Sequence, residues 1–140
     1  MARKFACLIA IAVMLLAVCA IASESDKEAA ALSAAYGWLK QVDEGNYAGS
    51  WQEAAEYFRN TVAKVKWVDG LKAARMPLGK LVSRTVKNTT YATSLPGAPD
   101  GKYVVIQFST SFDNKKQAIE TVTPMLDKDG VWRVSGYYIK

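Results

Sequence analysis

Apolar residues recur at steps of three and four from Glu28 onward, which predicts an amphipathic helix early in the chain. Its buried stripe is predicted to be Leu32, Ala35, Tyr36, Leu39 and Val42. Residues 43–46 end this helix, because Gly45 can take the left-handed conformation that closes a helix.

Two further helical segments are predicted before residue 80. Ser50 stands three residues before Glu53, which is the pattern of a capping box that opens a helix. A second helix is therefore expected to begin at Ser50, and Ser50→Ala is expected to cost about 1 kcal/mol through loss of this cap. A third helical stretch covers residues 61–75 and ends at Met76-Pro77, because proline cannot continue a helix.

After Gly79 the period of the pattern falls to two, and Val, Thr and Tyr become frequent, which predicts β-strands. The expected strands cover residues 81–95, 103–112, 118–126 and 131–139. Their connections are short and rich in turn residues, so neighbouring strands should be antiparallel. Pro124 lacks a backbone donor, which predicts a bulge or an edge position in the third strand.

Helices followed by a four-stranded antiparallel meander are typical of the α+β class. The apolar stripes of the helices need a partner, so we expect the N-terminal helices to pack on one face of a curved sheet. This order is similar to the nuclear transport factor 2-like fold, in which a cone encloses a pocket between helices and sheet. An open, cystatin-like packing of helix on sheet is the alternative.

The first 22 residues have the pattern of a secretory signal. Arg3 and Lys4 form a positive start, and residues 5–22 carry no charge. Small residues before Ser23 suit a signal peptidase, so we predict cleavage after about Ala22 and a mature domain over residues 23–140. A retained anchor and a lipoprotein attached through Cys19 are the alternatives, and either would place the protein at a membrane.

The residue types that are missing exclude several chemistries. The chain contains no histidine, and both cysteines, Cys7 and Cys19, lie in the predicted signal. Histidine-dependent nucleophilic systems and His/Cys zinc sites are therefore excluded from the mature chain. Residues 127–130 place glycine fourth, unlike the EF-hand calcium loop, so we predict no metal and no cofactor.

Glu120 is the carboxylate that stands out, because it interrupts an otherwise apolar strand. Arg84 and Arg133 lie in other predicted strands and could meet it, depending on the strand register. We hypothesise that Glu120 with Arg84 or Arg133 forms the polar floor of a ligand-binding pocket. The alternative is a structural cross-strand ion pair on the solvent face, worth about 0.2–1 kcal/mol.

Four long segments of the sequence resemble domain-of-unknown-function family 4019, which comprises small secreted bacterial proteins. They are AAYGWLKQVDEGNYAGSW, MPLGKLVSR, SLPGAPDGKYVVIQFSTSF and VTPMLDKDGVWRVSGYYIK. The resemblance covers residues from about Glu28 to Lys140. It implies a periplasmic or secreted bacterial protein and supplies no activity and no catalytic residues.

These observations favour a non-catalytic binding module for a small ligand or a protein partner, with a homodimer as a variant. Loss of Arg3 and Lys4 lowers the net charge of +5 by two, and the remaining charges are mixed along the chain, so nucleic acid is not an expected partner. The alternative function is an enzyme that uses Glu, Tyr and Arg in acid–base chemistry within a conical pocket.

Overall fold

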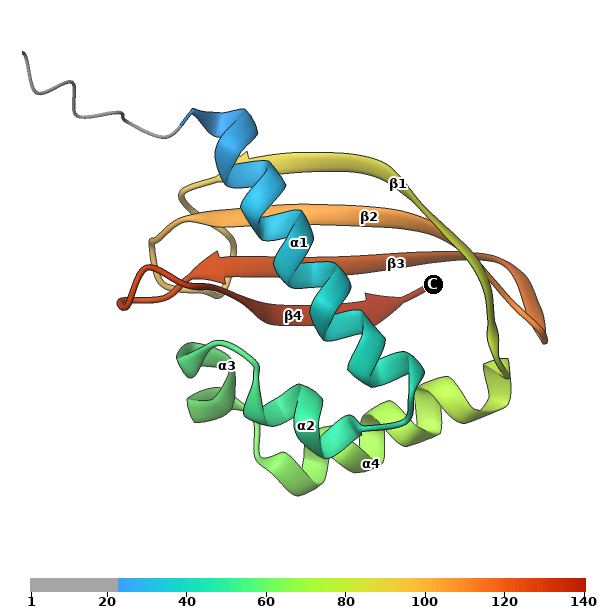
Figure 1. The fold of residues 1–140 in the computed structure, drawn as a ribbon. Coiled ribbons are helices and arrows are strands. Elements are labelled where there is room, and N and C mark those ends of the chain that lie inside the picture. The colour runs from blue at the N-terminus through green and yellow to red at the C-terminus, as the bar shows by residue number, and fades with distance from the viewer. Residues whose placement is uncertain (1–22) are drawn as a thin grey trace, which may run out of the picture.

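The computed structural model describes residues 23–140, and Figure 1 shows that the helices precede the strands along this part of the chain. The predicted signal segment, residues 1–22, lies outside the described residues together with both cysteines. The elements are α1 (Glu24–Asp43), α2 (Tyr47–Gln52), α3 (Glu56–Thr61), α4 (Lys64–Arg75), the 3₁₀ turn η1 (Met76–Leu78), β1 (Leu81–Ala92), β2 (Tyr103–Phe112), β3 (Lys115–Leu126) and β4 (Trp132–Ile139). Among residues 23–140, no helix combines the length and the apolar character needed to span a bilayer.

Helix α1 confirms the predicted first helix and begins slightly earlier. Ser23 and Asp26 form a capping box at its start, which satisfies free backbone N–H groups there. Gly45, with φ of +80°, follows its end as expected. The buried residues of α1 are Ala31, Ala35, Trp38, Leu39 and Val42. Tyr36, expected in this stripe, is 42% exposed, and its ring packs edge to face with the ring of Phe108.

The capping box predicted at Ser50 and Glu53 is wrong. Helix α2 starts earlier, and its cap is Asn46, whose side-chain oxygen accepts a hydrogen bond from the Gly49 backbone N–H at 3.0 Å. Ser50 is buried inside this helix, and its hydroxyl donates to the Tyr47 carbonyl at 2.6 Å. The same hydroxyl accepts from the Trp67 indole at 3.0 Å, so tertiary contacts occupy the group that the local motif assigned to a cap.

The segment expected to form one helix after Ser50 is divided into two. The backbone N–H of Ala55 donates to the Val134 carbonyl of β4 at 2.8 Å, instead of continuing the helix ladder. Ala55 takes an extended ψ of 148°, and α3 begins after it. Trp51, from the preceding helix, donates its indole N–H to the Val62 carbonyl at 2.8 Å, which ties α2 to the end of α3.

The four strands form one antiparallel sheet in the order β1-β2-β3-β4, which confirms the predicted meander and the α+β class. The β3–β4 register shifts between Val122 and Pro124, but the extra residue lies on β4, so the irregularity faces Pro124 and the bulge predicted in the third strand is not on β3 itself. The alternative edge position is wrong, because β3 lies between β2 and β4. The missing donor of Pro124 falls at the irregular step of the ladder, where an internal strand tolerates it.

Helix α1 crosses one face of the sheet, as Figure 1 shows, and makes the core with it. Leu39, Ile106 and Phe108 are fully buried between these layers. Within residues 23–140, no helix covers the opposite face of the sheet. The sheet is open, and the cone of a nuclear transport factor 2-like fold is not confirmed. The uncovered face is therefore the large surface that the fold leaves accessible.

The Ser50 hydroxyl should stabilise the fold through Trp67 rather than through a helix cap. We expect Ser50→Ala to cost about 1–3 kcal/mol, because the buried indole N–H loses its acceptor. In a Trp67→Phe background the same change should cost much less, because no indole N–H remains to be satisfied. Urea denaturation of the four proteins measures this coupling. An equal cost in both backgrounds would contradict the assignment, and Asn46→Ala, expected to cost about 1 kcal/mol, reports the true cap.

Candidate functional site

Glu120 lies on the face of β3 that points toward the helices, and its side chain is 0% exposed. Its Oε1 accepts hydrogen bonds from Arg84 Nε at 2.7 Å and from Thr110 Oγ1 at 2.6 Å. Its Oε2 accepts from Arg84 Nη2 at 3.1 Å and from the Tyr137 hydroxyl. A carboxylate offers about four lone-pair positions, so protein donors occupy all of them.

Arg84 joins Glu120 to the end of α1. Its Nη1 donates to Asp43 Oδ2 at 2.8 Å, and its Nη2 donates to Asp43 Oδ1 at 3.0 Å. The guanidinium is 6% exposed and lies between the two carboxylates. This bidentate geometry is available to arginine because its nitrogens form a rigid planar fork.

Arg75, at the end of α4, completes the cluster. Its Nη2 donates to Asp43 Oδ1 at 2.8 Å, and its guanidinium lies 4.8 Å from the centre of the Phe112 ring. Its Nε and Nη1 are buried and have no hydrogen-bond partner among the described residues. We call Asp43, Arg75, Arg84, Thr110, Glu120 and Tyr137 the buried charge cluster. Its two carboxylates balance its two guanidinium groups.

The cluster shifts the pKa of its members in directions that the contacts explain. Burial alone raises the pKa of Asp43, but hydrogen bonds from Arg84 and Arg75 and their positive charges outweigh it, so this pKa lies below 3.8. Burial raises the pKa of Tyr137 above 10.0, and the charge of Glu120 and the hydrogen bond to it act in the same direction. Asp43 is therefore held as a carboxylate and Tyr137 as a neutral phenol.

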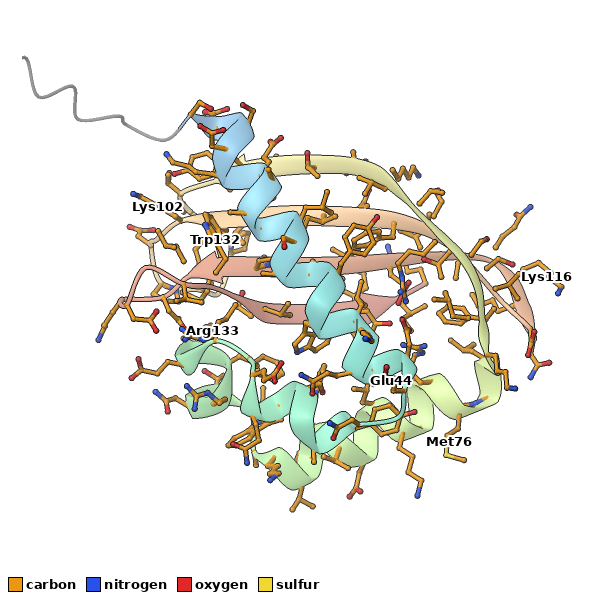
Figure 2. All side chains as sticks on the ribbon, in the orientation of Figure 1. Glu44, Met76, Lys102, Lys116, Trp132 and Arg133 are labelled. Atoms are coloured by element: carbon orange, nitrogen blue, oxygen red, sulfur yellow. The ribbon has the colours of Figure 1, made fainter. Side chains whose placement is uncertain are left out.

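Arg133 does not join this cluster. It is the second residue of β4 and forms ion pairs with Asp127 at 2.9 Å and Asp129 at 2.8 Å, both in the β3–β4 connection. Figure 2 shows Arg133 near α3, well separated from Glu44, the residue after Asp43. Hydrogen bonds from Arg133 lower the pKa of Asp129 to about 2. Of the two arginines expected beside Glu120, the structure places Arg84 there and Arg133 elsewhere.

Sequence reasoning missed Asp43 and Arg75 as members of the cluster. Asp43 precedes Gly45 and reads as part of a helix-ending turn, and Arg75 reads as a favourable charge at a helix C-terminus. Asp43 lies 32 residues from Arg75 and 41 residues from Arg84 along the chain.

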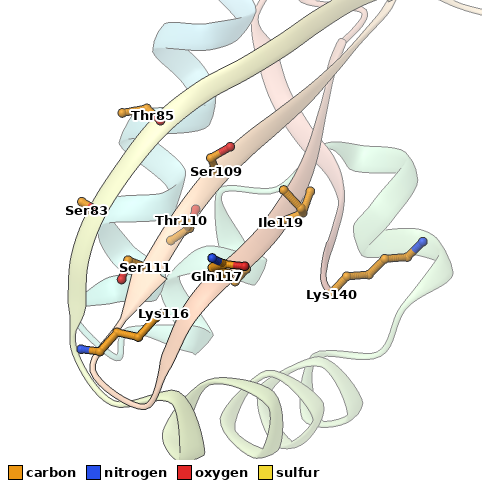
Figure 3. Close-up of a pocket in the computed structure, with 10 residues that line it drawn as sticks. Ser83, Thr85, Ser109, Thr110, Ser111, Lys116, Gln117, Ile119 and Lys140 are labelled. Carbon is orange, nitrogen blue, oxygen red and sulfur yellow. The ribbon is translucent and has the colours of Figure 1, made fainter.

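The uncovered face of the sheet contains a separate concave site of about 630 Å³. Figure 3 shows its lining from β1, β2 and β3, with Lys140 just after β4. We call this site the hydroxyl trough and define it by the side chains of Ser83, Thr85, Ser109, Ser111, Lys116, Gln117, Ile119 and Lys140. Thr110 and Ala118 also border it. Within residues 23–140, no group of three or more His, Cys, Asp or Glu side chains is arranged to hold a metal ion.

A smaller apolar groove of about 280 Å³ lies between α4 and β4. Trp67, Leu71 and Ala74 line it from α4, and Tyr138 lines it from β4. Neither Glu120 nor Arg84 lines this groove or the hydroxyl trough. The residues that the sequence singled out are thus separate from the concave surfaces described above.

Residues 34–137 match the model of the family described as Protein of unknown function (DUF4019). The chain therefore belongs to this family, as the four sequence segments indicated. No curated protein and no solved structure matches the chain.

Breaking the Glu120–Arg84 pair should strongly destabilise the protein. We expect Glu120→Gln to cost about 3–5 kcal/mol, because a buried guanidinium loses part of its compensating charge. Chemical denaturation measures this cost, and Asp129→Asn, which breaks an exposed pair, is the matched control with a much smaller effect. A double variant, Arg84→Met with Glu120→Leu, should be less destabilised than Glu120→Gln. A Glu120→Gln protein as stable as wild type would contradict a structural role.

Asp43 should make the protein sensitive to acid. Because its pKa is lower in the folded protein than the unfolded value of 3.8, its contribution is complete above that pH and is lost as the pH falls further. We expect the free energy of unfolding, measured from about pH 5 to about pH 2, to fall less steeply in Asp43→Asn. Identical pH slopes for Asp43→Asn and wild type would disprove this linkage.

Proposed function

We propose that this member of the DUF4019 family is an exported binding module that performs no catalysis, and that the uncovered face of its sheet is the binding surface. One observation carries the proposal. Glu120, the carboxylate most suited to chemistry by its sequence context, is fully buried and accepts four hydrogen bonds from protein donors.

A general base must reach the proton that it removes, within about 2.6–3.2 Å of the substrate atom. Glu120 has no free lone pair for such a contact, and Arg84 and Tyr137 direct their polar atoms at Glu120. The second candidate function is an enzyme that uses Glu, Tyr and Arg in acid–base chemistry. The only observation that favours it is the close grouping of Glu120, Arg84 and Tyr137. Access for a substrate would require opening a network that holds α1 on the sheet.

Binding, in contrast, needs a rigid surface with exposed polar groups. The buried charge cluster fixes the strands from within, and the hydroxyl trough lies on the accessible side of the same strands. Its volume of about 630 Å³ is within the range of about 300–1,000 Å³ that is typical of small-ligand sites. Export is supported by the charge and apolar pattern of residues 1–22.

Native mass spectrometry of the protein purified from the periplasm of its own bacterium tests this function. We expect a mature chain that begins near Ser23 and carries a bound ligand or partner. Ser109→Glu, which places a charge in the trough, should remove the bound species, while Thr90→Glu, on exposed β1 outside the trough lining, should retain it. A bound species retained by Ser109→Glu, or turnover that depends on Glu120 without a change in stability, would overturn the proposal.

A further inference from the structure

The hydroxyl trough presents an unusual density of small hydrogen-bonding groups. Ser83 and Thr85 project from β1, and Ser109 and Ser111 project from β2, each pair two residues apart and so on one face. Ser83 pairs with Ser111, and Thr85 pairs with Ser109, so the four hydroxyls form a compact block. Ser83, Thr85 and Ser109 are exposed and Ser111 is half-buried, so these groups are open to a ligand.

Thr110, between the two serines of β2, behaves differently. Its hydroxyl points to the opposite face and donates to Glu120 at 2.6 Å. The outward hydroxyls therefore do not serve the buried charge cluster. Gln117 of β3 adds an exposed amide, with both donor and acceptor capacity, to the same outer surface.

The charge of the trough has one sign. Lys116 and Lys140 are its charged side chains, both are exposed, and its lining contains no Asp or Glu. Figure 3 shows their side chains on opposite sides of Gln117. A ligand complementary to this surface carries negative charge together with many hydrogen-bonding groups.

Apolar contact is available beside the polar block. Ile119 lies in the lining, and backbone hydrogen bonds of 3.0 and 2.9 Å pair it with Lys140. Tyr138, two residues before Lys140 and opposite Thr121, is on the same face and is 52% exposed. An aliphatic and an aromatic surface next to hydroxyls suit a ligand whose rings have apolar faces and polar edges.

We propose that the hydroxyl trough binds an acidic saccharide, a chain of sugar rings that carries carboxylates. The sugar hydroxyls would bond to the serine, threonine and Gln117 side chains, and Lys116 and Lys140 would pair with the carboxylates. The C–H faces of the rings would lie against Ile119 and Tyr138. This inference rests on the proposed function, since it names the ligand class for the same surface. A second copy of the chain fits less well, because a symmetric contact would bring the lysines of two troughs together.

Isothermal titration calorimetry with trigalacturonic acid tests the ligand class, with neutral galactotriose and inorganic phosphate as comparison probes. We expect trigalacturonic acid to bind more tightly than either probe, and added salt to weaken it. Lys116→Glu and Lys140→Glu should each weaken binding about fivefold or more. Lys102→Glu, an equal charge change that Figure 2 shows at the other end of the sheet from Lys116, should leave it unchanged.

Three results would overturn the inference. If phosphate binds as tightly as trigalacturonic acid, the trough is only an anion site. If Lys102→Glu and Lys116→Glu lose the same affinity for trigalacturonic acid, the binding is non-specific electrostatic attraction. Absence of trigalacturonic acid binding would also reject the saccharide. If the native protein nevertheless carries a ligand that Ser109→Glu removes, the proposed binding function stands and only the ligand class is wrong. If neither trigalacturonic acid nor a native ligand binds, both the ligand class and the proposed function are rejected.

Discussion

The position of Arg84 between Asp43 and Glu120 is the constraint on which the arrangement of helix and sheet depends. Ions removed from water are costly unless their partners are close and well oriented, so each of these groups restricts the position of the others. Asp43 ends α1, while Glu120 lies within β3, and a shift of the helix would separate a guanidinium from a carboxylate in a dry environment. Arg75 adds a second contact to Asp43 and connects α4 to the same point.

Periodicity was sufficient to predict the first helix and the order of strands, because burial of one face imposes a regular spacing on apolar residues. Local motifs were less reliable. The Ser50–Glu53 spacing suits a cap, yet Ser50 bonds to Trp67, a residue that no local rule associates with it. Arg84 was one of two arginines expected beside Glu120, but Asp43 and Arg75 were missed, because their contacts depend on how distant elements pack. The strand register, which places Arg84 beside Glu120 and Arg133 away from it, is likewise a tertiary property.

Strand β2 separates two kinds of polar chemistry by alternation alone. Thr110 points inward to Glu120, while Ser109 and Ser111 point outward to the hydroxyl trough. Inside, every strong acceptor of Glu120 is occupied and the result is rigidity. Outside, similar hydroxyl groups face solvent, and the result is a surface suited to recognition. A slip of one residue in the strand register would exchange the inward and outward side chains. The internal ion pairs oppose such a slip, so they also keep Ser109 and Ser111 on the outer face.

The hydroxyl of Tyr137 contributes to Glu120 from β4, which spans Trp132–Ile139 and is the last strand of the sheet. Ribosomes deliver the chain from its N-terminus, so α1 and Asp43 emerge long before the residue that completes the network. Until β4 has emerged, Glu120 lacks one donor, and the edge of β3 that β4 later covers is unpaired. Completion of the hydrogen bonds to Glu120 therefore requires β4, the last of the described strands.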